Sequence, residues 1–315
     1  MLRSLFAILL AIAGIAWVQE VPAPTVDHHQ HLFSPATRVL SPTVKPVNAD
    51  DLIGFLDEAG IRRAVVLSIA YQYGNPNRPA VEDEYAKVKA ENDWTSVQVA
   101  RHPDRLRGLC GVNPLKPYAV AEIKRCSADP SLRFGITLHF GNSDVNLLDA
   151  RHRRQLETVF RTANQHRMAI VVHMRSTVSL KRPYGKAQAA AFLELFEAAP
   201  DMPVQVGHLA GAGGYDDPQV DEALEVFVDA IAAADVRTKN LFFDVSGVAG
   251  LGDWMGKAHE IAARLRQLGL ERLLYGSDGT ADLLRPRDAW AAFSKLPLSA
   301  EEFRVIATNV APYMR

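Results

Sequence analysis

Two histidines separated by one residue, His29 and His31, stand near the start of the chain in the run Asp27-His28-His29-Gln30-His31. If this run is an extended strand, His29 and His31 point to the same face. Two imidazoles on one face can bind a single zinc ion through nitrogen atoms at about 2.0–2.1 Å. His28 then faces the other way and is expected to be structural, and Asp27 is expected either to orient an imidazole or to bond the backbone.

Three later polar side chains also stand where an apparent strand ends. They are His173 after Val171-Val172, His208 after Val206-Gly207, and Asp278 after Tyr275-Gly276-Ser277. A single histidine in such a place is usually a hydrogen-bonded core or surface residue, but four strand ends together match the active face of a parallel barrel. We therefore predict one divalent metal held by His29, His31, His173 and Asp278. Zinc is expected first, with manganese, iron or cobalt as alternatives.

This set of side chains predicts chemistry on a carbonyl group. The metal would lower the pKa of a bound water toward about 7 and so supply hydroxide at neutral pH. Asp278 could take the proton of that water and pass it to the leaving group, and His208 could stabilise negative charge on the carbonyl oxygen. The prediction is hydrolysis of an amide, ester or lactone in a small, carboxylate-bearing substrate. The same groups could instead protonate a substrate carbon and release carbon dioxide.

Five residues are weaker candidates for contact with the substrate. Arg175 lies two residues beyond His173 and could bind a carboxylate with its forked guanidinium. Tyr71 and Tyr73 follow the second predicted strand, and Asn142 follows the fourth, so they fall in loops on the active side. His139 ends the fourth strand and is expected either to line the pocket or to add a ligand.

The elements that must position these residues alternate along the chain from residue 25 onward. The predicted strands lie near residues 25–27, 62–70, 105–112, 134–140, 168–174, 204–209, 241–245 and 272–275. The predicted helices lie near 49–59, 81–101, 119–126, 150–165, 187–199, 219–234 and 254–268, with two more from 288 and 301. Eight strands, each followed by a helix, predict an α/β fold that closes as a (β/α)8 TIM barrel; an open doubly wound sheet is the alternative.

Composition sets the remaining expectations. The 315 residues carry 35 basic and 36 acidic side chains, and a net charge of −1 gives no reason to expect nucleic acid as a partner. An apolar run from Leu5 to Val18 follows a positive start, which predicts a signal peptide over residues 1–20 and one domain over 21–315. We expect an exported protein, periplasmic or secreted, with no stable membrane span once the signal is cleaved. A small molecule is the expected partner, and a homodimer is left open.

The chain has two cysteines, Cys110 and Cys126. They could pair in an oxidising compartment, but the sequence does not show that their Cα atoms are close enough. Cys110 lies in a predicted strand, so a buried free thiol is the favoured interpretation.

The motifs together resemble the amidohydrolase superfamily, and most closely its amidohydrolase-2 branch. The resemblance is carried by Val26-Asp27-His28-His29-Gln30-His31, Val-Val-His173, Gly-His208-Leu-Ala-Gly and Tyr-Gly-Ser-Asp278, in that order, and by 92–94 and 101–106. That branch contains aminocarboxymuconate-semialdehyde decarboxylase, other decarboxylases and lactone-cleaving hydrolases. The resemblance implies the same four metal ligands and a role for His208 in handling charge or protons.

One position departs from superfamily members that bind two metals. Such members often have a bridging carboxylated lysine at the end of the fourth strand, where this chain has Thr137. We therefore expect one metal. Because export is unusual for a decarboxylase of central catabolism, hydrolysis is preferred to decarboxylation. A barrel that only binds a ligand is a third alternative, which would require one of the four ligand positions to be missing.

Overall fold

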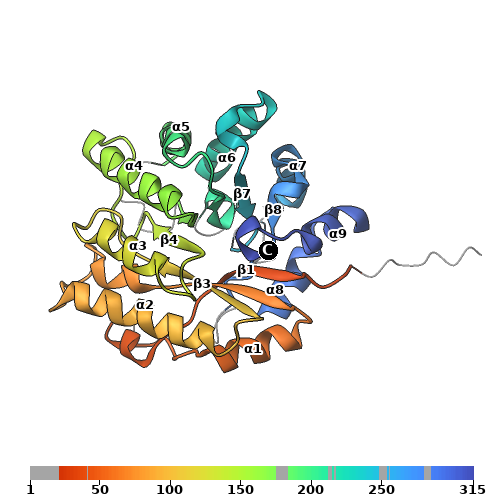
Figure 1. Cartoon of the computed structure of the whole chain (residues 1–315). Coiled ribbons are helices and arrows are strands. Elements are labelled where there is room, and N and C mark those ends of the chain that lie inside the picture. Colours follow the sequence, from red (N-terminus) through yellow and green to blue (C-terminus); the bar gives the residue numbers. More distant parts are fainter. Residues whose placement is uncertain are drawn as a thin grey trace, which may run out of the picture.

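Eight short parallel strands pair in chain order, β1 to β8, and form the wall of a barrel (Figure 1). The computed structural model describes residues 21–40, 42–174, 184–211, 215, 218–247, 254, 256–279 and 285–315. The strands are β1 (Val26–Gln30), β2 (Arg63–Leu67), β3 (Leu106–Gly111), β4 (Gly135–His139), β5 (Ala169–His173), β6 (Val204–Val206), β7 (Leu241–Asp244) and β8 (Leu273–Leu274). Backbone bonds from His28 N to Tyr275 O (2.8 Å) and from Asp278 N to His29 O (2.9 Å) join the chain after β8 to β1. The predicted (β/α)8 barrel is confirmed.

Helices surround the barrel and connect its strands. They are α1 (Ala49–Glu58), α2 (Glu84–Ala100), α3 (Ala119–Ser127), α4 (Ala150–Gln165), α5 (Lys186–Glu194), α6 (Pro218–Ala232), α7 (Ala258–Leu268), α8 (Pro286–Phe293) and α9 (Ala300–Thr308). Local sequence sets some of their starts: Asn48 and Asp51 form a reciprocal capping box at α1, and Ser299 and Glu302 form another at α9. Among the described residues, none of these helices has the length and apolar character to cross a membrane. The predicted signal peptide lies outside the described residues.

Two apolar layers fill the space on the two sides of the sheet. In β5, Ala169 and Val171 belong to the cluster inside the barrel, whereas Ile170 and Val172 belong to the cluster between the sheet and the helices. This alternation explains the unbroken apolar runs of the sequence, because helices cover the outer face of every strand. Tyr313 and Met314 pack into the inner cluster. The end of the chain therefore closes the floor of the barrel, opposite the carboxyl ends of the strands.

The two cysteines form a disulfide, so the expected free thiol was wrong. Cys110 in β3 and Cys126 in α3 are fully buried, with Cα atoms 6.1 Å apart. Cys110 faces outward, since its neighbour Leu109 lies in the inner cluster and Cys110 itself lies in the outer one. The helix that follows β3 packs on this outer face and brings Cys126 over the strand. A sequence separation of 16 does not reveal that contact.

Candidate metal centre

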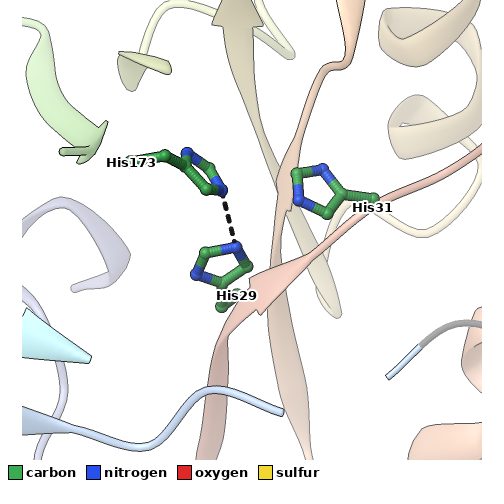
Figure 2. A group of neighbouring side chains, drawn as sticks. All are labelled: His29, His31 and His173. Atoms are coloured by element: carbon green, nitrogen blue, oxygen red, sulfur yellow. Dashed lines mark hydrogen bonds between the residues drawn. The ribbon is translucent and has the colours of Figure 1, made fainter. Parts of the chain in front are cut away.

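Three imidazoles converge at the carboxyl ends of β1 and β5 (Figure 2). His29 and His31 come from β1 and the residue after it, and His173 ends β5. The Nε2 atoms of His29 and His173 are 2.9 Å apart, and one ring nitrogen from each of the three residues lies within 4.8 Å of the others. All three side chains are buried. The predicted same-face placement of His29 and His31 is what the strand produces.

Hydrogen bonds fix which nitrogen of two of these rings is available. Nδ1 of His29 lies 2.9 Å from Asp244 Oδ2, and Nδ1 of His31 lies 2.7 Å from the carbonyl oxygen of Leu67. A carboxylate and a carbonyl can only accept, so each Nδ1 carries a proton and donates it. A neutral ring then keeps its lone pair on Nε2, which is the arrangement that a ligating imidazole needs.

The pKa values of His29 and His31 shift in opposite directions. Burial lowers the pKa of His31 to about 4, so that ring is neutral at pH 7. Burial also lowers the pKa of His29, but the negative charge of Asp244 outweighs it and raises the value to about 9. A proton and a divalent cation therefore compete for the same lone pair on His29, and cation binding should release protons.

Asp278 adds a carboxylate to this group. Its Oδ1 lies 3.6 Å from His31 Nε2 and 4.0 Å from His29 Nε2, and its side chain is 30% exposed. β8 ends at Leu274, so Asp278 follows the strand by four residues and not directly as the sequence suggested. Its φ of 52° turns the chain there, and its backbone N–H bonds to His29 O. Three nitrogen donors and one oxygen donor fit a divalent zinc, manganese or iron ion.

His208 stands beside the three imidazoles on a strained turn. β6 ends at Val206, three residues before the predicted strand end at residue 209, and His208 has φ 55°. Its ring centroid lies 4.5 Å from that of His29 and 5.1 Å from that of His173. The side chain is buried, and burial lowers its pKa. A neutral imidazole next to the candidate metal ligands can exchange a proton with a bound substrate.

Asp27 and His28 support the site from behind. Asp27 accepts from the backbone N–H groups of His29 (3.1 Å) and Ser277 (3.0 Å), so of the two roles predicted for it, the backbone bond is the one observed. Nδ1 of His28 donates to Tyr275 O (3.0 Å), and Nε2 accepts from Ala311 N (3.1 Å). His28 is structural, as the strand alternation predicted. Together these contacts tie β1 to the segment that carries Asp278.

Three of the candidate pocket residues gather next to His173. The ring of His139 contacts the rings of His173 and Tyr71, with a centroid distance of 5.0 Å to each, and the rings of Tyr71 and His173 are 6.4 Å apart. Nδ1 of His139 accepts from the backbone N–H of Asn142 (2.9 Å), and its Nε2 lies 3.0 Å from the Asn142 side-chain amide. Both ring nitrogens are therefore engaged. His139 presents a ring as a pocket wall and is poorly placed to act as a ligand.

Among the described pocket candidates, Tyr73 does not join this group. Tyr73 packs with Ala70 and Val88 in a separate small cluster, and Arg175 lies outside the described residues. Thr137, at the position of the bridging lysine in two-metal members, is buried, and its hydroxyl has no partner among the described residues. A neutral hydroxyl offers no charged bridge for a second ion.

Sequence reasoning missed two residues that shape the site. Ser246 Oγ lies 2.9 Å from His208 Nδ1, and a Cβ on Gly247 would lie 2.9 Å from the same atom. Asp244, the last residue of β7, bonds both His29 and the backbone of His208. The only signal in the sequence was that Asp244 ends a strand; nothing marked the serine and glycine that follow it.

The sequence of the chain matches a known protein family. A family model described as Amidohydrolase matches residues 26–309. Among curated proteins, none matches this chain.

Several solved structures share the fold. One is 5-carboxyvanillate decarboxylase from Sphingomonas paucimobilis (TM-score 0.61, 15% identity, covering 91% of this chain and 97% of that one). Another is 2,6-dihydroxybenzoate decarboxylase from Rhizobium (TM-score 0.64, 14% identity, covering 91% of this chain and 97% of that one). A third is 5-carboxyvanillate decarboxylase from Novosphingobium aromaticivorans complexed with manganese (TM-score 0.61, 16% identity, covering 92% of this chain and 95% of that one). At such identities the likeness shows the fold alone.

Proposed function

Because the chain belongs to the amidohydrolase family, as the match over residues 26–309 shows, we propose that it is a metal-dependent enzyme that releases carbon dioxide from a small carboxylate-bearing substrate. The observation that carries the metal-dependent part is the convergence of the three imidazole nitrogens, with the carboxylate of Asp278 beside them. When bound there, a divalent cation would polarise a substrate oxygen as a Lewis acid.

The proposal of decarboxylation reverses the preference drawn from the sequence. Hydrolysis came first there, but the solved structures of this fold named above are decarboxylases of aromatic acids. The named substrates carry a carboxylate next to a hydroxyl on an aromatic ring, and we propose the same class for this chain. Manganese is named in one of these structures, so manganese and zinc are both proposed as the working ion.

The residues of the chain would move the protons of this reaction. A substrate carbon gains a proton, the bond from that carbon to the carboxylate breaks, its electron pair stays with the substrate, and carbon dioxide leaves. Asp278 is the proposed donor to the carbon, because its Oδ1 lies 3.6 Å from His31 Nε2 and 4.0 Å from His29 Nε2, the two nitrogens proposed to hold the cation. The carboxylate of Asp278 must first take up a proton from solvent, and it gives this proton to the carbon. His208 is the proposed acceptor for the proton of a neighbouring substrate hydroxyl. The rings of Tyr71 and His139, which stack on each other, are the proposed aromatic contacts for the substrate.

Hydrolysis is kept as a second candidate because one observation favours it. The buried disulfide between Cys110 and Cys126 is typical of proteins from oxidising compartments, which supports the proposal of an exported protein. For an exported protein, hydrolysis of an amide, ester or lactone is favoured over decarboxylation. In that reaction Asp278 would take a proton from the attacking water and pass it to the leaving group, and His208 would stabilise charge on the carbonyl oxygen.

Product analysis separates the two reactions. Purified protein loaded with manganese, and separately with zinc, is incubated with hydroxylated aromatic acids and with a panel of lactones, esters and amides. The proposal expects carbon dioxide without any other acid product, lost with a chelator and restored by the metal. Acid release without carbon dioxide would favour hydrolysis. Tight metal binding with no turnover on either panel would favour a ligand-binding barrel. Asp278→Ala is the inactive control.

A further inference from the structure

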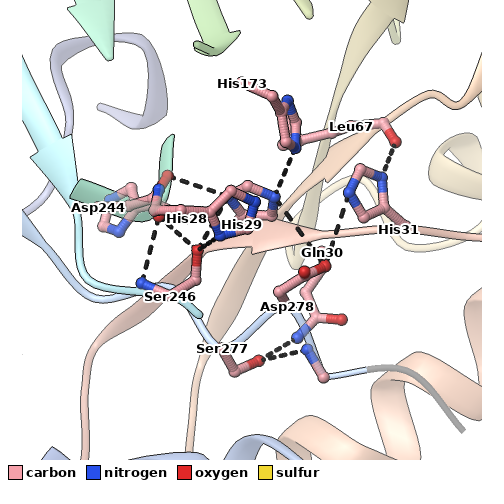
Figure 3. A network of polar contacts seen from close by, with 12 residues as sticks. His28, His29, Gln30, His31, Leu67, His173, Asp244, Ser246, Ser277 and Asp278 are labelled. Carbon is pink, nitrogen blue, oxygen red and sulfur yellow. Dashed lines mark hydrogen bonds and ion pairs between the residues drawn. The ribbon is translucent and has the colours of Figure 1, made fainter. Parts of the chain in front are cut away.

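The end of β7 holds a carboxylate that serves two parts of the site at once (Figure 3). Asp244 is fully buried. Its Oδ2 accepts from Nδ1 of His29 (2.9 Å) and from Nε2 of Gln205 (2.8 Å). Its Oδ1 accepts from the backbone N–H groups of His208 (3.0 Å) and Ser246 (3.2 Å), and from the Ser246 hydroxyl. Both oxygens are therefore committed.

The charge of Asp244 decides the direction of these bonds. Its Oδ1 accepts from two backbone N–H groups and its Oδ2 accepts from a side-chain amide, and these groups can donate but not accept. A proton on either oxygen would displace one of these donors, so the carboxyl is ionised and has no proton to donate. Every bond to it must be donated by its partner.

Counting protons then fixes the state of His208. A serine hydroxyl has a single proton, and that of Ser246 goes to Asp244 Oδ1. The Ser246 oxygen faces Nδ1 of His208 at 2.9 Å and can only accept there. Nδ1 of His208 therefore carries a proton, and in a neutral ring the lone pair is on Nε2.

The backbone around His208 is built for this contact. Three successive residues that are not glycine have left-handed φ values: His208 at 55°, Leu209 at 48° and Ala210 at 61°. Each such residue costs on the order of 1 kcal/mol or more, so the surroundings must hold the turn in place. The bond from His208 N to Asp244 does so at its first residue. Gly247 leaves room for the ring, since a Cβ there would lie 2.9 Å from His208 Nδ1.

We propose that Ser246 is a positioning residue that fixes His208 in the Nδ1–H tautomer, so that His208 reacts through Nε2. Asp244 holds Ser246, the strained turn and the metal ligand His29 on one carboxylate. The role of His208 with substrate rests on the proposed function. Its tautomer is a property of the folded chain and can be measured with no substrate present.

The test compares Ser246→Ala with Ser246→Thr in zinc-loaded protein. Histidine is labelled with nitrogen-15, and long-range proton–nitrogen correlation reads the ring tautomers; His208→Gln assigns the signals. We expect a pure Nδ1–H pattern for His208 in the native protein and in Ser246→Thr. Ser246→Ala should show a mixed pattern with unchanged zinc content. Ser34→Ala is the matched control, because it removes another buried serine hydroxyl, bonded to Glu91, and should leave the His208 signals unmoved.

Two further readouts make the result decisive. Turnover of Ser246→Ala should fall about 10- to 100-fold with KM nearly unchanged, the usual effect of losing a group that orients a functional histidine. Asp244→Asn should instead weaken zinc binding, because it changes the partner of His29. An unchanged Nδ1–H pattern in Ser246→Ala, or loss of zinc from that variant, would overturn the proposal. If no substrate is turned over, the proposed function fails. The tautomer measurement needs no substrate, so it still tests the role of Ser246.

Discussion

Nε2 of His29 and Nε2 of His173 lie 2.9 Å apart although the two residues are separated by 144 positions in the chain. Their strands, β1 and β5, are four strands apart in either direction around the barrel. Only closure of the sheet can bring these two atoms together over its axis. The candidate metal centre therefore depends on the whole barrel and not on one local motif.

The first prediction concerns the ligands. His173→Ala should weaken zinc or manganese binding by more than about 100-fold, since changes to residues that merely support a ligand already cost about 10- to 100-fold. His139→Ala is the matched control: its ring lies 5.0 Å from that of His173, but both of its nitrogens contact Asn142. Calorimetric titration of both variants, with circular dichroism to check folding, measures the difference. Equal loss of metal from both would make His139 a ligand.

The second prediction concerns acid stability. Burial lowers the pKa of His28 to about 4, against 6.5 for an ordinary histidine, so between these values the unfolded chain binds more protons than the folded one. Stability should therefore be retained above pH 6.5 and lost as the pH falls toward 4. The loss from this residue between pH 7 and pH 5 should be about 2 kcal/mol.

Urea unfolding at the two pH values measures this loss. His28→Gln cannot take up the proton, so the stability of that variant should depend less on pH by about the same amount. Comparing the two proteins cancels the contribution of the other buried histidines. An identical pH dependence in both would show that His28 is not the group responsible.

The third prediction concerns the disulfide. Ellman's reagent in denaturant without a reductant should find no thiol, and two thiols per chain would contradict the pairing. The bond closes a loop with a sequence separation of 16, and its loss should reduce the free energy of unfolding by about 3 kcal/mol. Urea unfolding with and without reductant gives this value. A Cys110→Ala/Cys126→Ala double variant should be insensitive to the reductant.

The fourth prediction concerns Gly247. Its φ of 60° is left-handed, and an added Cβ would meet Nδ1 of His208 at 2.9 Å. Gly247→Ala should therefore lower stability by about 1 kcal/mol through its backbone and displace the His208 ring. Metal content should stay unchanged while turnover falls. Gly54→Ala serves as the control, because a Cβ at that glycine meets nothing within 4 Å. Normal turnover in Gly247→Ala would show that the His208 ring tolerates the shift.

The alternation of elements and the strand ends made much of this molecule predictable from its sequence. Two-residue alternation predicted the shared face of His29 and His31, and apolar runs such as 169–172 predicted strands covered by helices. What escaped prediction depends on chain turns and on contacts between distant segments. His208 and Asp278 lie on left-handed turns beyond the ends of β6 and β8, and no residue type in the sequence indicates these turns. Ser246 gains its role only because β7 lies beside β6.

The floor of the barrel has one more consequence. The Tyr313 hydroxyl donates to Oε1 of Gln205, and the amide of Gln205 donates to Asp244 (2.8 Å). A residue on the underside of the molecule is thus two hydrogen bonds from the carboxylate that orients His29. A change at Tyr313, made for stability or for attachment to a support, is therefore expected to alter the hydrogen bonds of Asp244 and the orientation of His29 as well.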